Sequence, residues 1–196
     1  MVENLHPDAQ KWNEIFRQEG DAWLARQPRQ LLLDYAEMLP RQGLALDAAA
    51  GGAIHGRYLA ELGLHVIALD ISEVGLRLAR QRALAQGLWL EAAVYDLAHP
   101  WFPPNCFDVI VNFRFLERAT FPIYRRALKP GGWLVFETFV RTDTAVPSPA
   151  HYLNPGELKA AFADWEIAHY ADTAVPSPDC RLRQVEQLVA RKPRAA

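Results

Sequence analysis

The stretch that decides the fold, Leu44–Gly56, reads LALDAAAGGAIHG. Leu44–Asp47 is a short apolar run typical of a buried strand, and His55–Leu62 has apolar residues spaced by three and four, as in a helix. The small residues between them allow backbone N–H groups to approach a ligand at a helix N-terminus. The sequence therefore predicts a ligand-binding loop from Asp47 to Gly56.

Strand-like apolar runs alternate with helix-period stretches beyond this loop, which is typical of βαβ units with a parallel sheet. A C-terminal pair of strands has no helix between its members, so we expect that pair to be antiparallel. The prediction is an α/β fold with a doubly wound, mostly parallel seven-stranded sheet and a C-terminal antiparallel hairpin. The predicted strands are Leu44–Asp47, His65–Asp70, Leu88–Val94, Phe107–Phe113, Trp133–Phe139, Trp165–Tyr170 and Val185–Ala190, and the predicted helices are His55–Leu62, Val74–Gln86, Phe121–Leu128 and Pro155–Phe162.

Two helical stretches, Asp8–Gln18 and about Arg29–Leu39, precede the first strand and belong to no βαβ unit. We interpret residues 1–42 as an N-terminal helical lid and residues 43–196 as the α/β core of a single domain. The heptapeptide DTAVPSP occurs at Asp143–Pro149 and again at Asp172–Pro178. Both copies are predicted to be loops, because Pro and Ser clusters interrupt regular structure.

The composition favours a small-molecule partner over a polyanion. With 21 basic and 23 acidic residues the net charge is -2, which offers no basic field for nucleic acid. Two cysteines are too few for a disulfide framework. The N-terminus lacks the basic and apolar pattern of a secretory signal. No apolar run reaches the roughly 18 residues that a membrane-spanning helix needs. His99 and His151 show no metal-binding spacing, so no metal site is predicted. We expect a cytoplasmic protein that binds neither nucleic acid nor membranes, and the oligomeric state stays open.

Two cofactors are compatible with the loop. Gly51, Ala53 and Gly56 fit the dinucleotide pattern, and Asp70 lies near the offset of its ribose-binding acid, which favours a nicotinamide-dependent oxidoreductase. Asp47, however, lies at the end of the first strand. Its carboxylate would repel a pyrophosphate and attract a cation. S-adenosylmethionine carries an ammonium and a sulfonium group and no phosphate, and Asp70 could hold the ribose hydroxyls of either cofactor.

The chain resembles the class I S-adenosylmethionine-dependent methyltransferases across Leu44–Thr138. The resemblance rests on LDAAAGG, ALD, YDL at Tyr95–Leu97, FDVIVNF and LKPGGWLVFETF, which occur in that order. Outside this region WNEIF, GDAWLARQP and HYLNPGEL look like the small bacterial methyltransferases related to the tellurite-resistance protein TehB. The resemblance implies a Rossmann-like fold, S-adenosylmethionine as cofactor and a methyl-transfer activity.

The resemblance also implies roles for individual residues around the cofactor. The methionine and ribose would be lined by Asp47, Ala49, Gly51, Gly52 and Ala53, and the ribose hydroxyls would be held by Asp70. The adenine would contact Ile71, Asp96 and Leu97. The methionine portion would lie over Asn112 and Phe113. The chain departs from the family at Ala53, where glycine is usual, and at Ile54 and His55, where a polar pair is usual. Alanine at position 53 is unfavourable if the backbone there needs a positive φ.

Methyl transfer is an in-line displacement, so positioning carries much of the catalysis. A thiolate, an oxyanion or a tellurite-like anion needs no dedicated base, whereas a neutral hydroxyl does. The candidate substrate-side residues are Arg114, Glu137 and Tyr152. Alternatively, Arg114 is a solvated surface residue and Tyr152 only packs. A cofactor-binding protein without turnover and the nicotinamide enzyme remain as other functions.

Overall fold

The computed structural model describes residues 6–142, 149–176 and 182–194 of the chain. The helices are α1 (Pro7–Leu24), α2 (Gln30–Asp34), α3 (Ile54–Glu61), α4 (Glu73–Ala85), α5 (Thr120–Ala127) and α6 (Glu157–Ala161), with the 3-10 turns η1 (Ala36–Met38) and η2 (Pro149–His151). The strands are β1 (Leu44–Ala48), β2 (His65–Asp70), β3 (Leu90–Val94), β4 (Phe107–Phe113), β5 (Leu128–Phe139), β6 (Glu166–Pro176) and β7 (Leu182–Arg191).

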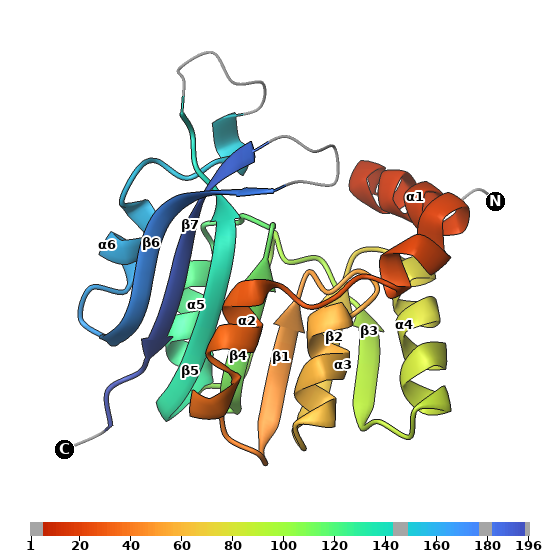
Figure 1. Ribbon diagram of the computed structural model, residues 1–196, viewed down its shortest axis with the longest axis horizontal. Coiled ribbons are helices and arrows are strands. Elements are labelled where there is room, and N and C mark those ends of the chain that lie inside the picture. Colours follow the sequence, from red (N-terminus) through yellow and green to blue (C-terminus); the bar gives the residue numbers. More distant parts are fainter. Residues whose placement is uncertain (1–5, 143–148, 177–181, 195–196) are drawn as a thin grey trace.

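The strands form one sheet in the order β3-β2-β1-β4-β5-β7-β6 (Figure 1). Neighbours from β3 to β5 pair in parallel, whereas β7 pairs antiparallel with both β5 and β6. β4 lies in the middle of the sheet and is buried along its length except at Asp108, which explains its nearly continuous apolar sequence. The predicted α/β fold with a C-terminal antiparallel hairpin is confirmed.

Two apolar clusters cover the two faces of the sheet. One cluster joins Tyr124 of α5 and Leu158 of α6 to strand residues such as Leu134. The other joins residues of α2, α3 and α4 to the opposite face, which includes Val135. Consecutive strand residues point to opposite faces, so Leu134 and Val135 enter different clusters. Helices therefore cover both faces, as a doubly wound sheet requires.

The two N-terminal helices occupy different places. α1 lies against α4 at the end of the sheet to which the parallel strands point (Figure 1), and a Cβ on Gly20 would lie 2.6 Å from Leu78. α2 instead packs on a face of the sheet, where Leu31 and Leu32 are buried in the core. Of residues 6–42, α1 therefore lies beyond the strand ends (Figure 1), whereas α2 forms part of the core.

Some predicted boundaries are wrong because long-range pairing extends the strands. β5 begins at Leu128 rather than Trp133, since Leu128 pairs with Phe107 across a bulge. The second DTAVPSP copy was predicted as a loop, yet residues 172–176 continue β6 and pair with β7. Pro176 is compatible with that position because β6 is an edge strand. Of the first copy, residues 143–148 lie outside the described residues.

None of the helices in residues 6–142, 149–176 and 182–194 has the length and apolar character needed to cross a membrane.

Candidate functional site

Four parallel strands bring polar residues to one edge of the sheet. β1, β2, β4 and β5 place Asp47, Asp70, Asn112 and Glu137 near their carboxyl ends, where ligands of open α/β sheets bind. These side chains belong to residues that are 1%, 9%, 0% and 2% exposed, respectively. Polar side chains gathered at the carboxyl ends of parallel strands indicate a binding site.

The loop after β1 adopts left-handed backbone conformations at positions that carry alanine. Ala49 has φ 54°, Gly51 has φ 54° and Ala53 has φ 47°. Left-handed geometry costs an alanine roughly 1–2 kcal/mol. The loop nevertheless closes onto α3, since the Ala53 amide donates to Ala50 O at 2.7 Å and Arg57 N donates to Ala53 O at 2.8 Å. The departure at Ala53 thus adds strain while preserving the turn.

Asp47 supports the start of α3 from beneath the loop. Its Oδ2 accepts a hydrogen bond from Gly56 N at 2.7 Å. Burial raises the pKa of Asp47 to about 7, and the negative charge of Asp70 adds to the increase. A cationic ligand beside Asp47 would favour its ionised form.

The titration of Asp47 predicts a pH dependence of stability. The folded protein keeps the Asp47 proton up to about pH 7, whereas a carboxyl at its ordinary value of 3.8 loses it earlier. The free energy of unfolding should therefore fall between about pH 4 and 7, by on the order of 1 kcal/mol per pH unit. An Asp47→Asn variant, whose amide oxygen can still accept from Gly56, should lack this slope and be more stable than wild type at pH 8 in urea unfolding. The exposed control Asp34→Asn should keep the wild-type dependence of unfolding free energy on pH. If Asp47→Asn showed the same dependence as this control, Asp47 would not be its cause.

Asp70 joins the two loops that follow β1 and β2. Its Oδ2 accepts from Gly51 N at 2.8 Å, and its Oδ1 accepts from Ser72 N at 2.7 Å. Ser72 caps α4, since its hydroxyl accepts from Gly75 N at 3.1 Å. Burial raises the pKa of Asp70, although the backbone donors oppose this.

Helix α1 covers these loops. The Phe16 ring contacts the backbone so closely that a Cβ on Gly51 or Gly75 would lie 2.9 Å from it. Asn13 Oδ1 accepts from the Ser72 hydroxyl at 2.8 Å and from Val74 N at 3.1 Å. Phe16 and Asn13 are 3% and 5% exposed. A ligand that approaches Gly51 from the side of the missing Cβ would therefore contact Phe16.

On the other side of the site, Arg114 and Glu137 form a buried ion pair. Parallel pairing aligns Phe113 with Glu137, and Arg114 N donates to Glu137 O at 2.8 Å. The side chains meet at 3.0 Å between Nε and Oε1, and they are 15% and 3% exposed. Gln187 of β7 donates to the other Glu137 oxygen at 2.6 Å. The interpretation of Arg114 as a solvated surface residue is therefore wrong.

The surroundings of Arg114 are aromatic and positively charged. Its guanidinium lies 4.5 Å from the Phe139 ring, which lies 6.1 Å from the ring of Tyr152. Burial lowers the pKa of Arg114 to about 10 against the attraction of Glu137, and Arg29 and Arg183 lower it further. The three predicted substrate-side residues thus lie along one side of the site, and Arg29 and Arg183 are within electrostatic range of Arg114.

His55, a departure from the family pattern, stacks on Phe113 with ring centroids 4.1 Å apart. Burial lowers the pKa of His55, and the charge of Arg29 has the same effect, so the imidazole is neutral at pH 7. The contact explains how an aromatic residue replaces a polar one there without loss of packing.

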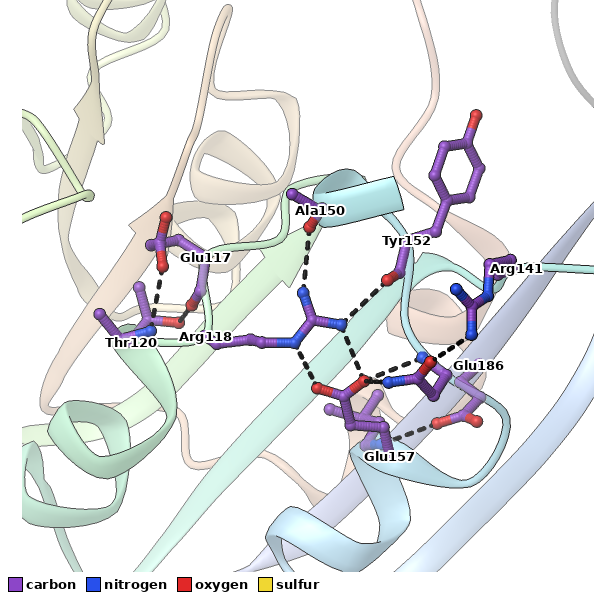
Figure 2. Close-up of polar contacts among 11 residues, drawn as sticks. Glu117, Arg118, Thr120, Arg141, Ala150, Tyr152, Glu157 and Glu186 are labelled. Atoms are coloured by element: carbon purple, nitrogen blue, oxygen red, sulfur yellow. Dashed lines mark hydrogen bonds and ion pairs between the residues drawn. The ribbon is translucent and has the colours of Figure 1, made fainter. Parts of the chain in front are cut away.

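Arg118 holds the segment that carries Tyr152. Figure 2 shows its guanidinium between Glu157 and the backbone. Arg118 Nε donates to Glu157 Oε1 at 2.5 Å, and its terminal nitrogens donate to Ala150 O and Tyr152 O at 3.0 Å each. This pairing holds the pKa of Glu157 below its ordinary value. The Tyr152 ring points away from these contacts (Figure 2), so Arg118 positions the backbone of the segment rather than the phenol.

The remaining predicted cofactor residues lie at the same edge with different exposure. Leu97 is buried, Ile71 is half-buried and Asp96 is exposed, with its Oδ1 accepting from Ala98 N at 2.8 Å. Asn112 donates to the Tyr124 hydroxyl at 3.4 Å, and its Oδ1 has no hydrogen-bond partner among the described residues. In that same part of the chain, no group of three or more His, Cys, Asp or Glu residues could hold a metal ion.

Sequence reasoning missed the contribution of the C-terminal hairpin and of the segment before α2. Gln187 contacts Glu137, His169 lies 3.4 Å from Gln187, and the His169 ring is 5.2 Å from that of Tyr35. Arg29 acts on both His55 and Arg114. No local pattern marks these residues: the pairing of β5 with β7 places Gln187 beside Glu137, and the packing of α2 on the sheet brings Arg29 and Tyr35 nearby.

The residues at β1 and β2 fit an adenosine cofactor with a cationic group. Two buried carboxylates are available for a cation and for ribose hydroxyls, and Asn112 has an unpaired buried acceptor. A Cβ on Gly51 would meet Phe16, and a Cβ on Gly52 would meet Leu24 and Phe16, so side chains of α1 pack directly on this part of the loop.

Comparison with known proteins gives matches in sequence and in structure. Residues 45–132 match a family model described as a methyltransferase domain. The ubiquinone biosynthesis O-methyltransferase of Nitrosococcus oceani is 36% identical over 108 residues, covering 51% of this chain and 45% of that protein. The corresponding protein of Caulobacter vibrioides is 30% identical over 162 residues, covering 69% of this chain and 64% of its own length. The first of these alignments spans about half of the relative's length.

The crystal structure of TehB from Haemophilus influenzae resembles this chain with a TM-score of 0.74 and 20% sequence identity, covering 92% of this chain and 67% of that one. Identity this low shows a shared fold and does not decide the subgroup.

Proposed function

Because this chain carries the domain of the class I S-adenosylmethionine-dependent methyltransferases, we propose that it transfers a methyl group from S-adenosylmethionine to an oxygen atom of a small acidic molecule. The predicted family, its Rossmann-like fold and its cofactor are confirmed, so the nicotinamide alternative is set aside. The acceptor and the activity of this chain are proposals.

The observation that carries this proposal is the buried Arg114 guanidinium at the carboxyl end of β4. Arg114 is paired with Glu137, and two further arginines, Arg29 and Arg183, lie within electrostatic range of it. Such a site favours an acceptor whose nucleophilic oxygen carries negative charge, for example a phenolate. Oxygen is favoured over sulfur because the sequence relatives are named O-methyltransferases.

The roles of the residues follow from their positions. The cofactor, when bound, supplies an electrophilic methyl group on sulfur. Asp70 would hold the ribose hydroxyls, and Asp47 would face the cationic methionine end of the cofactor. Arg114 would stabilise the oxyanion of the acceptor and lower its pKa, so that no separate base is required. Glu137 and Gln187 keep the guanidinium in place. Tyr152 and Phe139 would close the aromatic side of the pocket.

Thiols and tellurite-like anions are further acceptors that the sequence favours and that the same positive pocket could hold. Membership of the TehB-like subgroup and a cytoplasmic location also remain predictions. The second candidate function, cofactor binding without turnover, is favoured by one observation, the strained alanines in the cofactor loop.

Two measurements test the proposed function. Calorimetric titration with S-adenosylmethionine, S-adenosylhomocysteine and NAD should give binding of the first two only. Transfer of labelled methyl groups should then occur to a catechol in preference to a thiol or tellurite. Binding of NAD alone would reject the proposal, and cofactor binding without transfer to any acceptor would establish the non-catalytic alternative.

Removing the Phe16 ring should open the cofactor site. In Phe16→Ala, the closed position of α1 lacks the contacts that the Phe16 ring makes with Gly51 and Gly75. Truncating a buried Phe typically costs about 3–5 kcal/mol, and each 1.4 kcal/mol of closure energy corresponds to roughly tenfold in rate. We therefore expect association of S-adenosylmethionine to accelerate at least about tenfold. Stopped-flow tryptophan fluorescence can follow it, because Trp12 and Trp23 flank Phe16.

The control for this prediction is Gln18→Ala, an exposed position on the same helix. Equal association rates in wild type, Phe16→Ala and Gln18→Ala would show that α1 does not limit entry.

A further inference from the structure

A cavity lies outside the proposed methyl-transfer site. It has a volume of about 340 Å³ and lies between the connector that follows α1, the outer surface of α3 and the end of α4. Its walls include Arg26 and Pro28 of the connector, Arg57 and Glu61 of α3 and Arg82 of α4. None of the residues predicted to bind cofactor or acceptor lines it. The proposed function therefore does not account for this cavity.

The cavity walls carry more positive than negative charge. Three arginines, Arg26, Arg57 and Arg82, face a single acid, Glu61. Within the described residues none of these arginines has a carboxylate within 4.0 Å. Burial lowers the pKa of Arg57, and the positive charge of Arg82 lowers it further. Like charges gathered in this way attract an anion.

Arg57 is a buried wall residue of the cavity with a fixed hydrogen bond, not a solvated surface side chain. The residue is 8% exposed, and one terminal nitrogen donates to Leu24 O at 2.9 Å. The other terminal nitrogen makes only a long contact of 3.4 Å with Gln86 Oε1. Its Nε is buried and has no hydrogen-bond partner among the described residues. A contact of 3.4 Å is longer than an ordinary N–H···O hydrogen bond, so this second terminal nitrogen is only weakly satisfied.

Arg26 is held in a fixed orientation at the opposite wall. Its guanidinium lies 3.7 Å from the centroid of the Trp23 ring, a stacking arrangement that leaves the edge nitrogens available for an acceptor. A stacked guanidinium loses less freedom when it binds an anion than a mobile side chain does.

We propose that this cavity binds a small molecule through a phosphate group, held by Arg26, Arg57 and Arg82. Guanidinium groups match phosphate oxygens in bidentate geometry, and three of them against one carboxylate leave a charge that a phosphate dianion balances. The volume is at the lower end of the range for ligand pockets, roughly 300–1,000 Å³, which limits the ligand to a small molecule. The proposal is independent of methyl transfer.

The test is a calorimetric titration of the full chain with pyrophosphate at constant ionic strength in a phosphate-free buffer. Wild type should bind one pyrophosphate per chain. Arg82→Gln and Arg26→Gln should each weaken binding roughly tenfold or more, because a hydrogen bond to a charged group contributes about 1.5–3 kcal/mol. Glu61→Gln should strengthen binding, since it removes the only acid on the cavity wall.

The matched control is Arg80→Gln, which removes an exposed arginine from α4 that does not line the cavity. Its pyrophosphate affinity should equal that of wild type. Absence of binding at one site per chain, or equal affinities of Arg82→Gln and Arg80→Gln, would overturn the proposal. Arg57 is left unchanged because its bond to Leu24 supports the fold.

Discussion

Replacing Asp70 by alanine should weaken the binding of S-adenosylmethionine by roughly 10²–10⁴-fold, as expected for the loss of two charge-assisted hydrogen bonds of about 1.5–3 kcal/mol each. The carboxylate lies at the end of β2 and already orders both cofactor loops through Gly51 N and Ser72 N. The substitution removes the ribose contacts and loosens the surface that receives the cofactor. Calorimetry measures the affinity directly.

The controls separate binding from folding. Alanine leaves Gly51 N and Ser72 N, which donate to the Asp70 carboxylate, without this acceptor, so circular dichroism must first show that the variant is folded. Asp70→Asn retains one acceptor oxygen and should show an intermediate loss of affinity. Glu73→Ala removes a nearby exposed acid and should bind as wild type does. Wild-type affinity in folded Asp70→Ala would reject the ribose assignment.

The Arg114–Glu137 pair should have the largest effect on stability. Arg114→Met leaves Glu137 buried and uncompensated, which is expected to cost about 3–5 kcal/mol in the free energy of unfolding. The double variant Arg114→Met with Glu137→Gln removes both charges and should recover most of that loss. Urea unfolding measures each value. Methyl transfer should remain low in both variants, because neither has the guanidinium that we propose to stabilise the acceptor oxyanion.

An exposed ion pair on α1 provides the comparison. Arg17 and Glu14 meet at 3.2 Å with side chains that are 56% and 57% exposed, so Arg17→Met should change stability by less than about 1 kcal/mol. If Arg114→Met were as stable and as active as Arg17→Met, the pair would have neither the structural nor the acceptor-binding role. If the double variant recovered methyl transfer together with stability, only the acceptor role would be rejected.

The strands and the polar residues at their carboxyl ends could be predicted from the sequence because they follow from local periodicity. β4 appears as FDVIVNF because the central strand is buried on both faces, and acids that follow such strands must meet at the same edge. The cap at Ser72 and the turn at Gly87 are local features too, since both depend on a few neighbouring residues. The strain at Ala53 followed from the residue type once the turn was expected.

The ends of the strands could not be predicted from local sequence. The segment KPGG contains residues that usually interrupt a strand, yet β5 begins before it because Leu128 pairs with Phe107. Two identical heptapeptides illustrate the same point. Residues 172–176 of the second copy form part of β6 only because β7 lies beside them.

The sequence alone therefore determined the sheet, its helical cover and the carboxylates at the strand ends, since burial patterns and turn residues act over a few positions. The tertiary structure decided which side chains meet across the sheet and across helices. It placed Gln187 against Glu137, Phe16 against Gly51 and Arg82 near Arg57. Each of these contacts joins residues far apart in the chain, and its geometry depends on strand register and helix packing that no local pattern records.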